Sequence, residues 1–206
     1  EKLEENDLLF LLVEKFSSID LSPSKVSNYE MGLMFEELLR KFSEMSNETS
    51  GEHYTPRDVV QLLVSLVFSE DKKKMKKLPV VSIYDCCCGT GGMLTIGRDW
   101  LNKNINKKIK TLLFGQELNP ETYAICKAEM LITGEDPENI KSQSCISKDK
   151  FKDQKFQFMI TNPPYGVSWK KEKNFVNNES KNLSGRFSAG TPRVDDGQLL
   201  FLQHLI

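Results

Sequence analysis

Three short segments contain residues of the kind that hold a nucleoside cofactor and a planar amine. The first runs from Asp85 to Gly92 and reads Asp-Cys-Cys-Cys-Gly-Thr-Gly-Gly, directly after an apolar run. Glycines let a ligand approach the backbone, and a helix that starts at such a turn points unpaired N–H groups at that ligand. A tight turn without any ligand uses the same glycines, so this segment alone is a weak signal.

Two common nucleotide-binding motifs do not fit this loop. A phosphate-binding P-loop continues with Lys and then Ser or Thr, whereas Met93 and Leu94 follow Gly92 here. A dinucleotide-binding fingerprint needs a third glycine further on, where this chain has Leu94 and Thr95. Both motifs are excluded by residue type.

The second segment, Gly115-Gln116-Glu117, ends in an acidic residue after another apolar run. A carboxylate at the end of a strand can accept hydrogen bonds from both ribose hydroxyls of a nucleoside cofactor. An exposed surface glutamate would have the same sequence, so Glu117 is a candidate and no more.

The third segment is Asn162-Pro163-Pro164-Tyr165, which follows a further apolar run. Two prolines stiffen the backbone and remove N–H donors, which leaves carbonyl acceptors beside the Asn162 side-chain oxygen. Such acceptors suit a planar –NH₂ group, and Tyr165 can stack on the ring that carries the amine. A rigid turn with a buried tyrosine is the weaker alternative for so specific a tetrapeptide.

Each segment follows a predicted strand. Four apolar runs predict strands, at residues 80–84, 111–115, 139–144 and 156–160. The helix between the second and third runs is well marked, because Asn119 caps it, Pro120 opens it and Gly134 ends it. Strands that alternate with helices indicate a parallel α/β sheet, and the ligands of such sheets lie beyond the carboxyl ends of the strands.

The spacing of apolar residues predicts helices in the first fifty residues, followed by a polar linker at residues 46–51. We therefore divide the chain into a helical segment with linker, residues 1–50, and a main domain, residues 51–206. The main domain starts with a helix for which Thr55 is the expected N-cap and Pro56 the first helical residue. Its expected apolar stripe is Val59, Leu63 and Leu66.

Composition excludes several classes of protein. No apolar run approaches the roughly 18 residues that cross a bilayer, and no signal peptide is visible. The 28 basic and 29 acidic residues give a net charge of −1. A protein that binds DNA unaided usually has a basic excess, so a nucleic-acid role needs a partner or a local patch. The lysine run 72–77 is more simply a solvated connection.

The five cysteines include three consecutive ones and lack the C-x-x-C spacing of zinc sites, and the chain has only two histidines. We expect a reduced, cytoplasmic protein with buried thiols and no metal site.

The order of the motifs resembles that of the amino-methyltransferases that use S-adenosyl-L-methionine. More narrowly, it resembles the methyltransferase (modification) subunit of type I restriction-modification systems, from about residue 8 to the end. This order is Tyr54-Thr55-Pro56, the glycine loop, Glu117 and Asn162-Pro163-Pro164-Tyr165, with further similarity at residues 30–57, 166–170 and 186–201.

The resemblance implies a Rossmann-like class I methyltransferase sheet with flanking helices, preceded by a short helical segment. It implies direct in-line transfer of a methyl group from S-adenosylmethionine to the exocyclic amine of a flipped adenine, without a covalent enzyme intermediate. The implied catalytic residues are Asn162, Pro163, Pro164 and Tyr165. The implied cofactor-binding residues are Glu52, His53, Tyr54, Thr55, Pro56, Arg57, Asp85, Gly89, Thr90, Gly91, Gly92 and Glu117. The implied partners are double-stranded DNA, a DNA-specificity subunit, a restriction (nuclease) subunit and a second copy of the chain, with no membrane.

The chain departs from the family pattern at several positions. Cys86 stands where Pro is usual, Met93 where Phe is usual and Gln157 where Asp is common. Residues 142–145 replace a turn that lies near the cofactor adenine in relatives, so we expect no cofactor contact there. The chain begins without Met and has four predicted strands of the usual seven, so we expect a fragment whose sheet is completed by further residues.

Two other functions stay open. The same Asn-Pro-Pro-Tyr motif occurs in enzymes that methylate a protein glutamine or an RNA guanine amine, although these generally lack the Tyr-Thr-Pro segment. A non-catalytic scaffold subunit would explain the altered turn at residues 142–145 and the missing strands.

Overall fold

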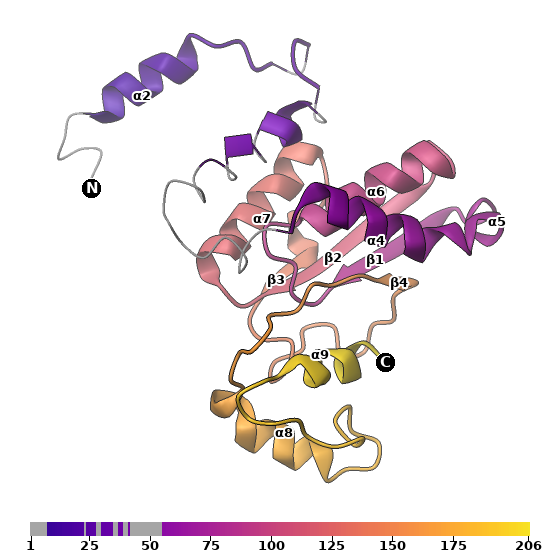
Figure 1. Ribbon diagram of the computed structural model, residues 1–206. Helices are drawn as coiled ribbons and strands as arrows, with labels where there is room; N and C mark the ends of the chain where they lie inside the picture. Colours follow the sequence, from indigo (N-terminus) through magenta and orange to yellow (C-terminus); the bar gives the residue numbers. More distant parts are fainter. Residues whose placement is uncertain (1–7, 23, 28–29, 35–36, 39–40, 42–54) are drawn as a thin grey trace.

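The computed structural model describes residues 8–22, 24–27, 30–34, 37–38, 41 and 55–206. At its centre is a sheet of strands β1 (Val80–Asp85), β2 (Lys110–Glu117), β3 (Ile140–Ser142) and β4 (Phe158–Met159), shown in Figure 1. The strand order is β3-β2-β1-β4 and every neighbouring pair is parallel. The predicted parallel α/β sheet and all four predicted strand positions are confirmed.

The register of the sheet brings the candidate segments to one edge. Asp85 at the end of β1 is paired with Gly115, and Glu117 at the end of β2 is paired with Ser142. Beyond β4, the Ile160 N–H donates to the Tyr84 carbonyl at 3.0 Å, so the chain leaves the sheet beside Asp85. The glycine loop, Glu117 and the Asn-Pro-Pro-Tyr segment therefore start from adjacent strand ends.

Strand β4 is short but is held by a side chain. The Gln157 Oε1 atom accepts hydrogen bonds from the Ser82 backbone N–H at 2.6 Å and from the Ser82 hydroxyl at 2.7 Å. Gln157 thus ties the start of β4 to β1.

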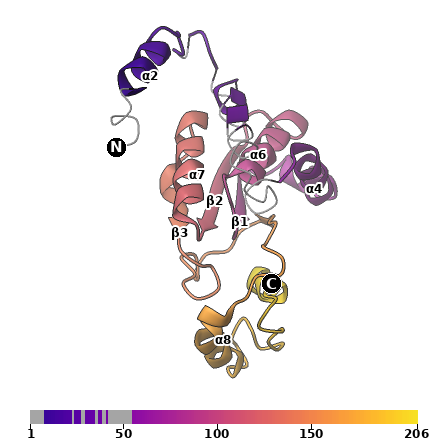
Figure 2. The same ribbon diagram turned by 60° about the vertical axis from the view of Figure 1, so that its left-hand side comes forward.

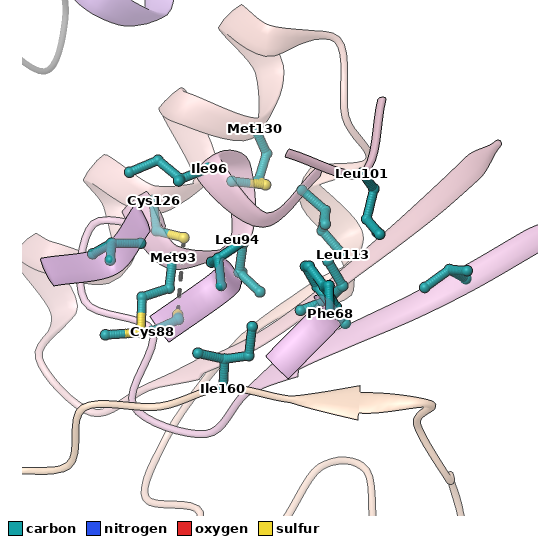
Figure 3. Packing of buried hydrophobic residues seen from close by; sticks show 14 of the residues in the cluster. Phe68, Cys88, Met93, Leu94, Ile96, Leu101, Leu113, Cys126, Met130 and Ile160 are labelled. Carbon is teal, nitrogen blue, oxygen red and sulfur yellow. Dashed lines mark hydrogen bonds between the residues drawn. The ribbon is translucent and has the colours of Figure 1, made fainter. Parts of the chain in front are cut away.

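Three helices cover one face of the sheet in Figures 1 and 2: α4 (Arg57–Ser69), α6 (Gly92–Asn104) and α7 (Pro120–Thr133). They enclose the larger hydrophobic core, in which Phe68, Leu94, Leu113 and Met130 are almost completely buried (Figure 3). Burying one such side chain stabilises a fold by about 1.5–3 kcal/mol. This core sets the position of the loop that precedes α6.

The opposite face of the sheet packs against the C-terminal part of the chain. Side chains of a strand alternate between faces, so Tyr84 and Phe114 point away from the core that holds Ile83 and Leu113. They join a second cluster that includes Phe187. This part contains α8 (Lys173–Ser180) and α9 (Gln198–Leu205), which lie on the far side of the sheet from α7 in Figures 1 and 2.

Short elements complete the described chain. They are α5 (Lys72–Met75) and the 3₁₀ turns η1 (Pro137–Asn139) and η2 (Lys170–Glu172). The predicted helix α7 is confirmed in detail, since the Asn119 side chain accepts hydrogen bonds from the backbone N–H groups of Glu121 and Thr122 and Gly134 ends the helix in the left-handed conformation.

The N-terminal helix α2 (Leu8–Ser17) confirms a predicted helix but has no buried residue, and it extends away from the sheet in Figures 1 and 2. Residues 30–34 are helical too, and a Cβ atom on Gly32 would lie 3.3 Å from the Thr133 side chain of α7. The predicted linker lies outside the described residues, so the division at residue 50 stays a prediction. None of the helices in the described ranges is both long and apolar enough to cross a membrane.

Candidate active site

The glycine loop between β1 and α6 is tightly packed on one side and open on the other. Gly89 and Gly91 have φ angles of 54° and 92°, in the left-handed region that favours glycine. A Cβ atom on Gly91 would lie 2.9 Å from the Cys126 Sγ atom of α7, whereas a Cβ atom on Gly92 would meet none of the described residues within 4 Å. The loop thus offers free space at the N-terminus of α6, whose unpaired N–H groups and dipole favour a negatively charged group.

Glu117 is fixed by two backbone groups. Its Oε2 atom accepts a hydrogen bond from the Gly89 N–H at 2.9 Å, and its Oε1 atom accepts one from the Asn119 N–H at 2.7 Å. A carboxylate oxygen has two lone pairs, so each oxygen can still accept from a ligand hydroxyl. Glu117 is only half-buried, so part of the carboxylate stays accessible from outside.

Asp85 lies beneath the loop with only 1% of its surface exposed. Its Oδ1 atom accepts a hydrogen bond from the Cys87 N–H at 3.0 Å. Burial raises the pKa of Asp85 to about 8, with a smaller contribution from the neighbouring Cys86, while hydrogen bonds to Thr161 and Cys87 oppose the rise. Asp85 therefore carries a proton near neutral pH and holds the backbone of the loop.

Asn162 is joined to the segment that precedes α4. Its Nδ2 group donates a hydrogen bond to the Thr55 Oγ1 atom at 3.1 Å. Because the Asn162 amide N–H group has this partner, its Oδ1 atom is the end that can accept from an amine. Asn162 and Pro163 are half-buried and Pro164 is exposed.

Tyr165 has 67% of its surface exposed. The alternative of a rigid turn with a buried tyrosine does not describe this residue. A ring in this position has a face available for a planar base, next to the acceptors of Asn162 and Pro163.

The predicted helix cap at Thr55 is wrong by one residue. Helix α4 begins at Arg57, Pro56 occupies the N-cap position, and no side chain caps the helix. Thr55 lies one residue further out because its hydroxyl accepts the bond from Asn162 instead of a helix N–H. Among the other residues expected at the cofactor, Arg57 is half-buried at the start of α4, while Glu52, His53 and Tyr54 lie outside the described residues.

Gln116 organises the neighbouring turn and was not singled out in the sequence. Gln116 is fully buried. Its Nε2 group donates hydrogen bonds to the carbonyls of Gln143 and Lys148, at 3.0 and 2.9 Å. Its Oε1 atom accepts a hydrogen bond from the Lys150 N–H. Gln143 has a φ angle of 123° and a buried Oε1 atom without a hydrogen-bond partner. A polar residue within the apolar strand β2 was the signal that could have drawn attention to Gln116.

Residues 26–206 match the model of the N-6 DNA methylase family. The chain belongs to this family. The family predicted from the order of the motifs is thereby confirmed. As a family member, the chain places its glycine loop, Glu117 and Asn-Pro-Pro-Tyr segment at the carboxyl edge of a parallel sheet, where α/β enzymes bind their ligands.

Curated relatives of this N-6 DNA methylase chain are subunits of type I restriction enzymes. It is 28% identical over 166 residues to the methylase subunit of the type I restriction enzyme MjaIX of Methanocaldococcus jannaschii, covering 81% of this chain and 28% of the relative. It is 30% identical over 183 residues to the EcoEI methylase subunit of Escherichia coli, covering 84% of this chain and 35% of the relative. The chain thus spans about a third of these relatives.

A solved structure shows the same fold. The methyltransferase subunit of a type I restriction-modification system from Streptococcus thermophilus superposes with a TM-score of 0.67 at 22% identity, over 93% of this chain and 38% of that one. The predicted α/β methyltransferase fold, a parallel sheet with flanking helices, is confirmed.

Proposed function

We propose that the protein containing this chain is the methylase subunit of a type I restriction-modification system, and that it transfers a methyl group from S-adenosylmethionine to the exocyclic amine of adenine in DNA. The observation that carries the proposal is the hydrogen bond between Asn162 and Thr55, at the same sheet edge as the loop held by Glu117. Asn162 would bind the amine of the substrate, and the loop with Glu117 would bind the nucleoside cofactor.

The described residues fit S-adenosylmethionine. Glu117 would hold the ribose hydroxyls, because both of its oxygens are fixed with acceptor capacity to spare. The backbone at Gly91 and Gly92 would lie against the cofactor, since the space above Gly92 is free. Residues 55–57 belong to the segment that the family resemblance assigns to the methionine end. The cofactor supplies an electrophilic methyl group on its sulfonium.

The chain's own residues would position the substrate amine. The Asn162 Oδ1 atom and the Pro163 carbonyl would accept the two amine hydrogens, which directs the nitrogen lone pair out of the ring plane for in-line attack. Most of the acceleration then comes from orientation and from fixed dipoles. Tyr165 would stack on the base; stacking of this kind is worth about 1–3 kcal/mol, which offsets much of the few kcal/mol that base extrusion costs.

We further propose that the active protein works with partners. The net charge of −1 gives no general affinity for DNA, so a separate DNA-specificity subunit would supply it. A nuclease subunit and a second methylase copy belong to the same proposal. All five cysteines are free thiols. This supports a cytoplasmic location, because disulfides are rare in the reducing cytoplasm.

Two alternatives make different predictions. An enzyme for a protein glutamine or an RNA amine would use the same Asn-Pro-Pro-Tyr chemistry, but the contact to Thr55 favours the DNA enzyme because such enzymes generally lack the upstream segment. A scaffold subunit would need neither the fixed carboxylate of Glu117 nor an exposed Tyr165.

The test uses the full-length protein with its specificity subunit. Radiolabelled methyl transfer is measured on DNA, RNA and protein acceptors, beside S-adenosylmethionine binding by calorimetry. The proposal predicts transfer to DNA that Asn162→Ala abolishes while the cofactor Kd changes less than threefold. Transfer only to RNA or protein, or no cofactor binding by the wild type, would contradict it.

A further inference from the structure

Three metal-binding side chains meet beside the sheet, outside the proposed active site. Cys86 follows β1, Cys145 lies in the turn after β3, and His204 belongs to α9. The two Sγ atoms and a ring nitrogen of His204 all lie within 4.8 Å of one another. Cys86 and Cys145 are 2% and 3% exposed, so the group is enclosed by the second hydrophobic cluster.

The chemistry of this group is that of a soft-metal site. Thiolates and imidazole are the preferred ligands of Zn²⁺, with Zn–S distances of about 2.3 Å and Zn–N distances of about 2.0–2.1 Å. Tetrahedral coordination then separates the ligand atoms by roughly 3.5–3.8 Å. From separations of up to 4.8 Å, the three atoms would have to approach one another by up to about 1.0–1.3 Å, through rotation of the side chains. Two thiolates also balance the charge of one divalent ion, so the bound site adds no net charge to the core.

Cys87 is the candidate fourth ligand, and it lies beside the set of three whose ligand atoms are all within 4.8 Å of one another. The Cys87 Sγ atom lies 3.9 Å from the Cys86 Sγ atom, and Cys87 is half-buried. Three sulfurs and one nitrogen make a common structural zinc set; a water molecule in place of Cys87 would give an open one. The Thr161 Oγ1 atom, 3.6 Å from the Cys86 Sγ atom, lies in the surrounding shell.

The neighbours of His204 define its tautomer. Arginine cannot accept hydrogen bonds, so the contact of 2.9 Å between Arg186 Nη1 and His204 Nδ1 means that Nδ1 carries a lone pair. The proton is on Nε2, which lies 3.2 Å from the Tyr84 Oη atom. A metal at Nδ1 would keep the Nε2–H bond to Tyr84 as the outer partner that metal-bound histidines usually have.

Metal binding at Nδ1 would displace the Nη1 group of Arg186, which occupies the lone pair of that nitrogen. This side chain also donates to both carboxylate oxygens of Glu179 and to the carbonyls of Cys145 and Ile146. Its charge stays neutralised by Glu179, and the Nη2 group keeps its bond to the Ile146 carbonyl. The Nη1 group has to move away from Nδ1 when the metal binds.

The chain contains an internal comparison. Cys88 and Cys126 are buried thiols with Sγ atoms 3.8 Å apart, between the glycine loop and α7 (Figure 3). They join no cluster of three metal ligands within the described part of the chain. The Cys88–Cys126 pair shows that two close thiols also occur in the core without a third ligand. The group of Cys86, Cys145 and His204 differs because it includes an imidazole.

We propose that Cys86, Cys145 and His204, with Cys87 or water as the fourth ligand, form a binding site for a thiophilic divalent ion of the Zn²⁺ type. The ion would fasten α9 and the turn after β3 to the end of β1, three residues before Gly89. Its role is to hold the C-terminal part of the chain against the sheet, and it takes no part in methyl transfer. The proposal is independent of the proposed function.

Cobalt is the probe for the test, because Co²⁺ bound to thiolates gives an intense charge-transfer absorption. The reduced full-length protein is titrated with Co²⁺ and then with Zn²⁺. One Co²⁺ per chain with thiolate absorption, displaced by Zn²⁺, is expected. Cys86→Ser, Cys145→Ser and His204→Gln should each weaken binding at least tenfold, while Cys88→Ser and Cys126→Ser should change it less than twofold.

A second measurement uses the unaltered protein, in case a variant does not fold. Thiols are alkylated with and without Zn²⁺, and the modified cysteines are located by mass spectrometry. Protection of Cys86 and Cys145 beyond that of Cys88 and Cys126 is expected. No thiolate–Co²⁺ absorption, equal loss of binding in the Cys88 and Cys86 variants, or equal protection of all four cysteines would overturn the proposal.

Discussion

Asn162 donates a hydrogen bond from its side-chain amide to the hydroxyl of Thr55 at 3.1 Å, across 107 residues of sequence. This bond joins the Asn-Pro-Pro-Tyr segment at the end of β4 to the residue before the N-cap of α4. It orients the amide so that the Asn162 oxygen is available to an incoming amine. The bond brings together two segments that lie far apart in the sequence.

Thr55→Val should slow methyl transfer without weakening cofactor binding. Valine has a similar shape but no acceptor, so the Asn162 amide loses the bond that fixes its orientation. A lost hydrogen bond of about 1–1.5 kcal/mol corresponds to a rate decrease of roughly tenfold. Single-turnover kinetics and calorimetry on the full-length complex check this. Thr55→Ser is the matched control and should retain most of the rate; an equal loss in both variants would mean that the hydroxyl is not what matters.

Glu117→Gln should weaken S-adenosylmethionine binding by about 10–100-fold, because each carboxylate oxygen already accepts from a backbone N–H. An amide NH₂ must face one of these N–H groups, donor against donor. Isothermal titration calorimetry measures the Kd. Glu121→Gln, an exposed glutamate in the first turn of α7, should leave the Kd within twofold. Similar losses in the two variants would point to charge alone and count against the ribose role.

Alanine at the two adjacent glycines of the loop should give opposite results. Gly91→Ala adds a Cβ atom 2.9 Å from the Cys126 Sγ atom at a φ angle of 92°, so we expect it to lower the free energy of unfolding by about 1–3 kcal/mol. Gly92→Ala meets no atom of the described residues within 4 Å and should leave stability nearly unchanged, but it should weaken cofactor binding. Urea denaturation and calorimetry separate these effects.

Gly190→Ala isolates the backbone contribution, since Gly190 has a φ angle of 116° with open space around its Cβ position. It should cost less than Gly91→Ala. Equal destabilisation by the Gly91 and Gly92 variants would contradict the packing described here.

The pH dependence of stability should reveal Asp85. Its folded-state pKa of about 8 lies above the unfolded value, so between these values the folded state binds one more proton. The free energy of unfolding therefore falls as the pH rises from about 4 to about 8, by up to about 1.4 kcal/mol per pH unit from this group. Asp85→Asn removes the titration and keeps the oxygen acceptor for Cys87. Urea denaturation at several pH values should show a flatter profile for this variant; an unchanged slope would mean that Asp85 does not titrate in this range.

The sheet and α7 were predictable because their signals are local. Asn119, Pro120 and Gly134 mark a helix by its termini, and apolar runs mark buried parallel strands. The buried face of α4 was predicted only in part: the predicted Leu63 packs against the core, whereas the predicted Val59 and Leu66 are 43% and 61% exposed. The buried residues of this helix are Val60, Val64 and Phe68. Its apolar residues cover a broad arc, so packing against α6 decides which stripe within that arc is buried.

The parts of the site that escaped prediction depend on distant contacts. Thr55 is a residue type that commonly caps helices. Its hydroxyl instead accepts a hydrogen bond from Asn162, which lies 107 residues away in the sequence. In the same way, spacing alone gave no reason to group Cys86, Cys145 and His204, because the sheet and α9 bring them together. Candidate cofactor and base residues could be predicted from local motifs. Contacts between residues far apart in the sequence could not, because they depend on the fold.

The most direct test of the central claim is made in a bacterial host that lacks adenine methylation. The full-length protein is expressed with its specificity subunit, as wild type, as Asn162→Ala, and as Asn178→Ala, an exposed control in α8. The host genome is then sequenced for N6-methyladenine. We expect methylation at one bipartite sequence motif in the wild type and the Asn178 variant, and none in the Asn162 variant. An unmethylated genome with the wild-type complex, or full methylation with Asn162→Ala, would contradict it.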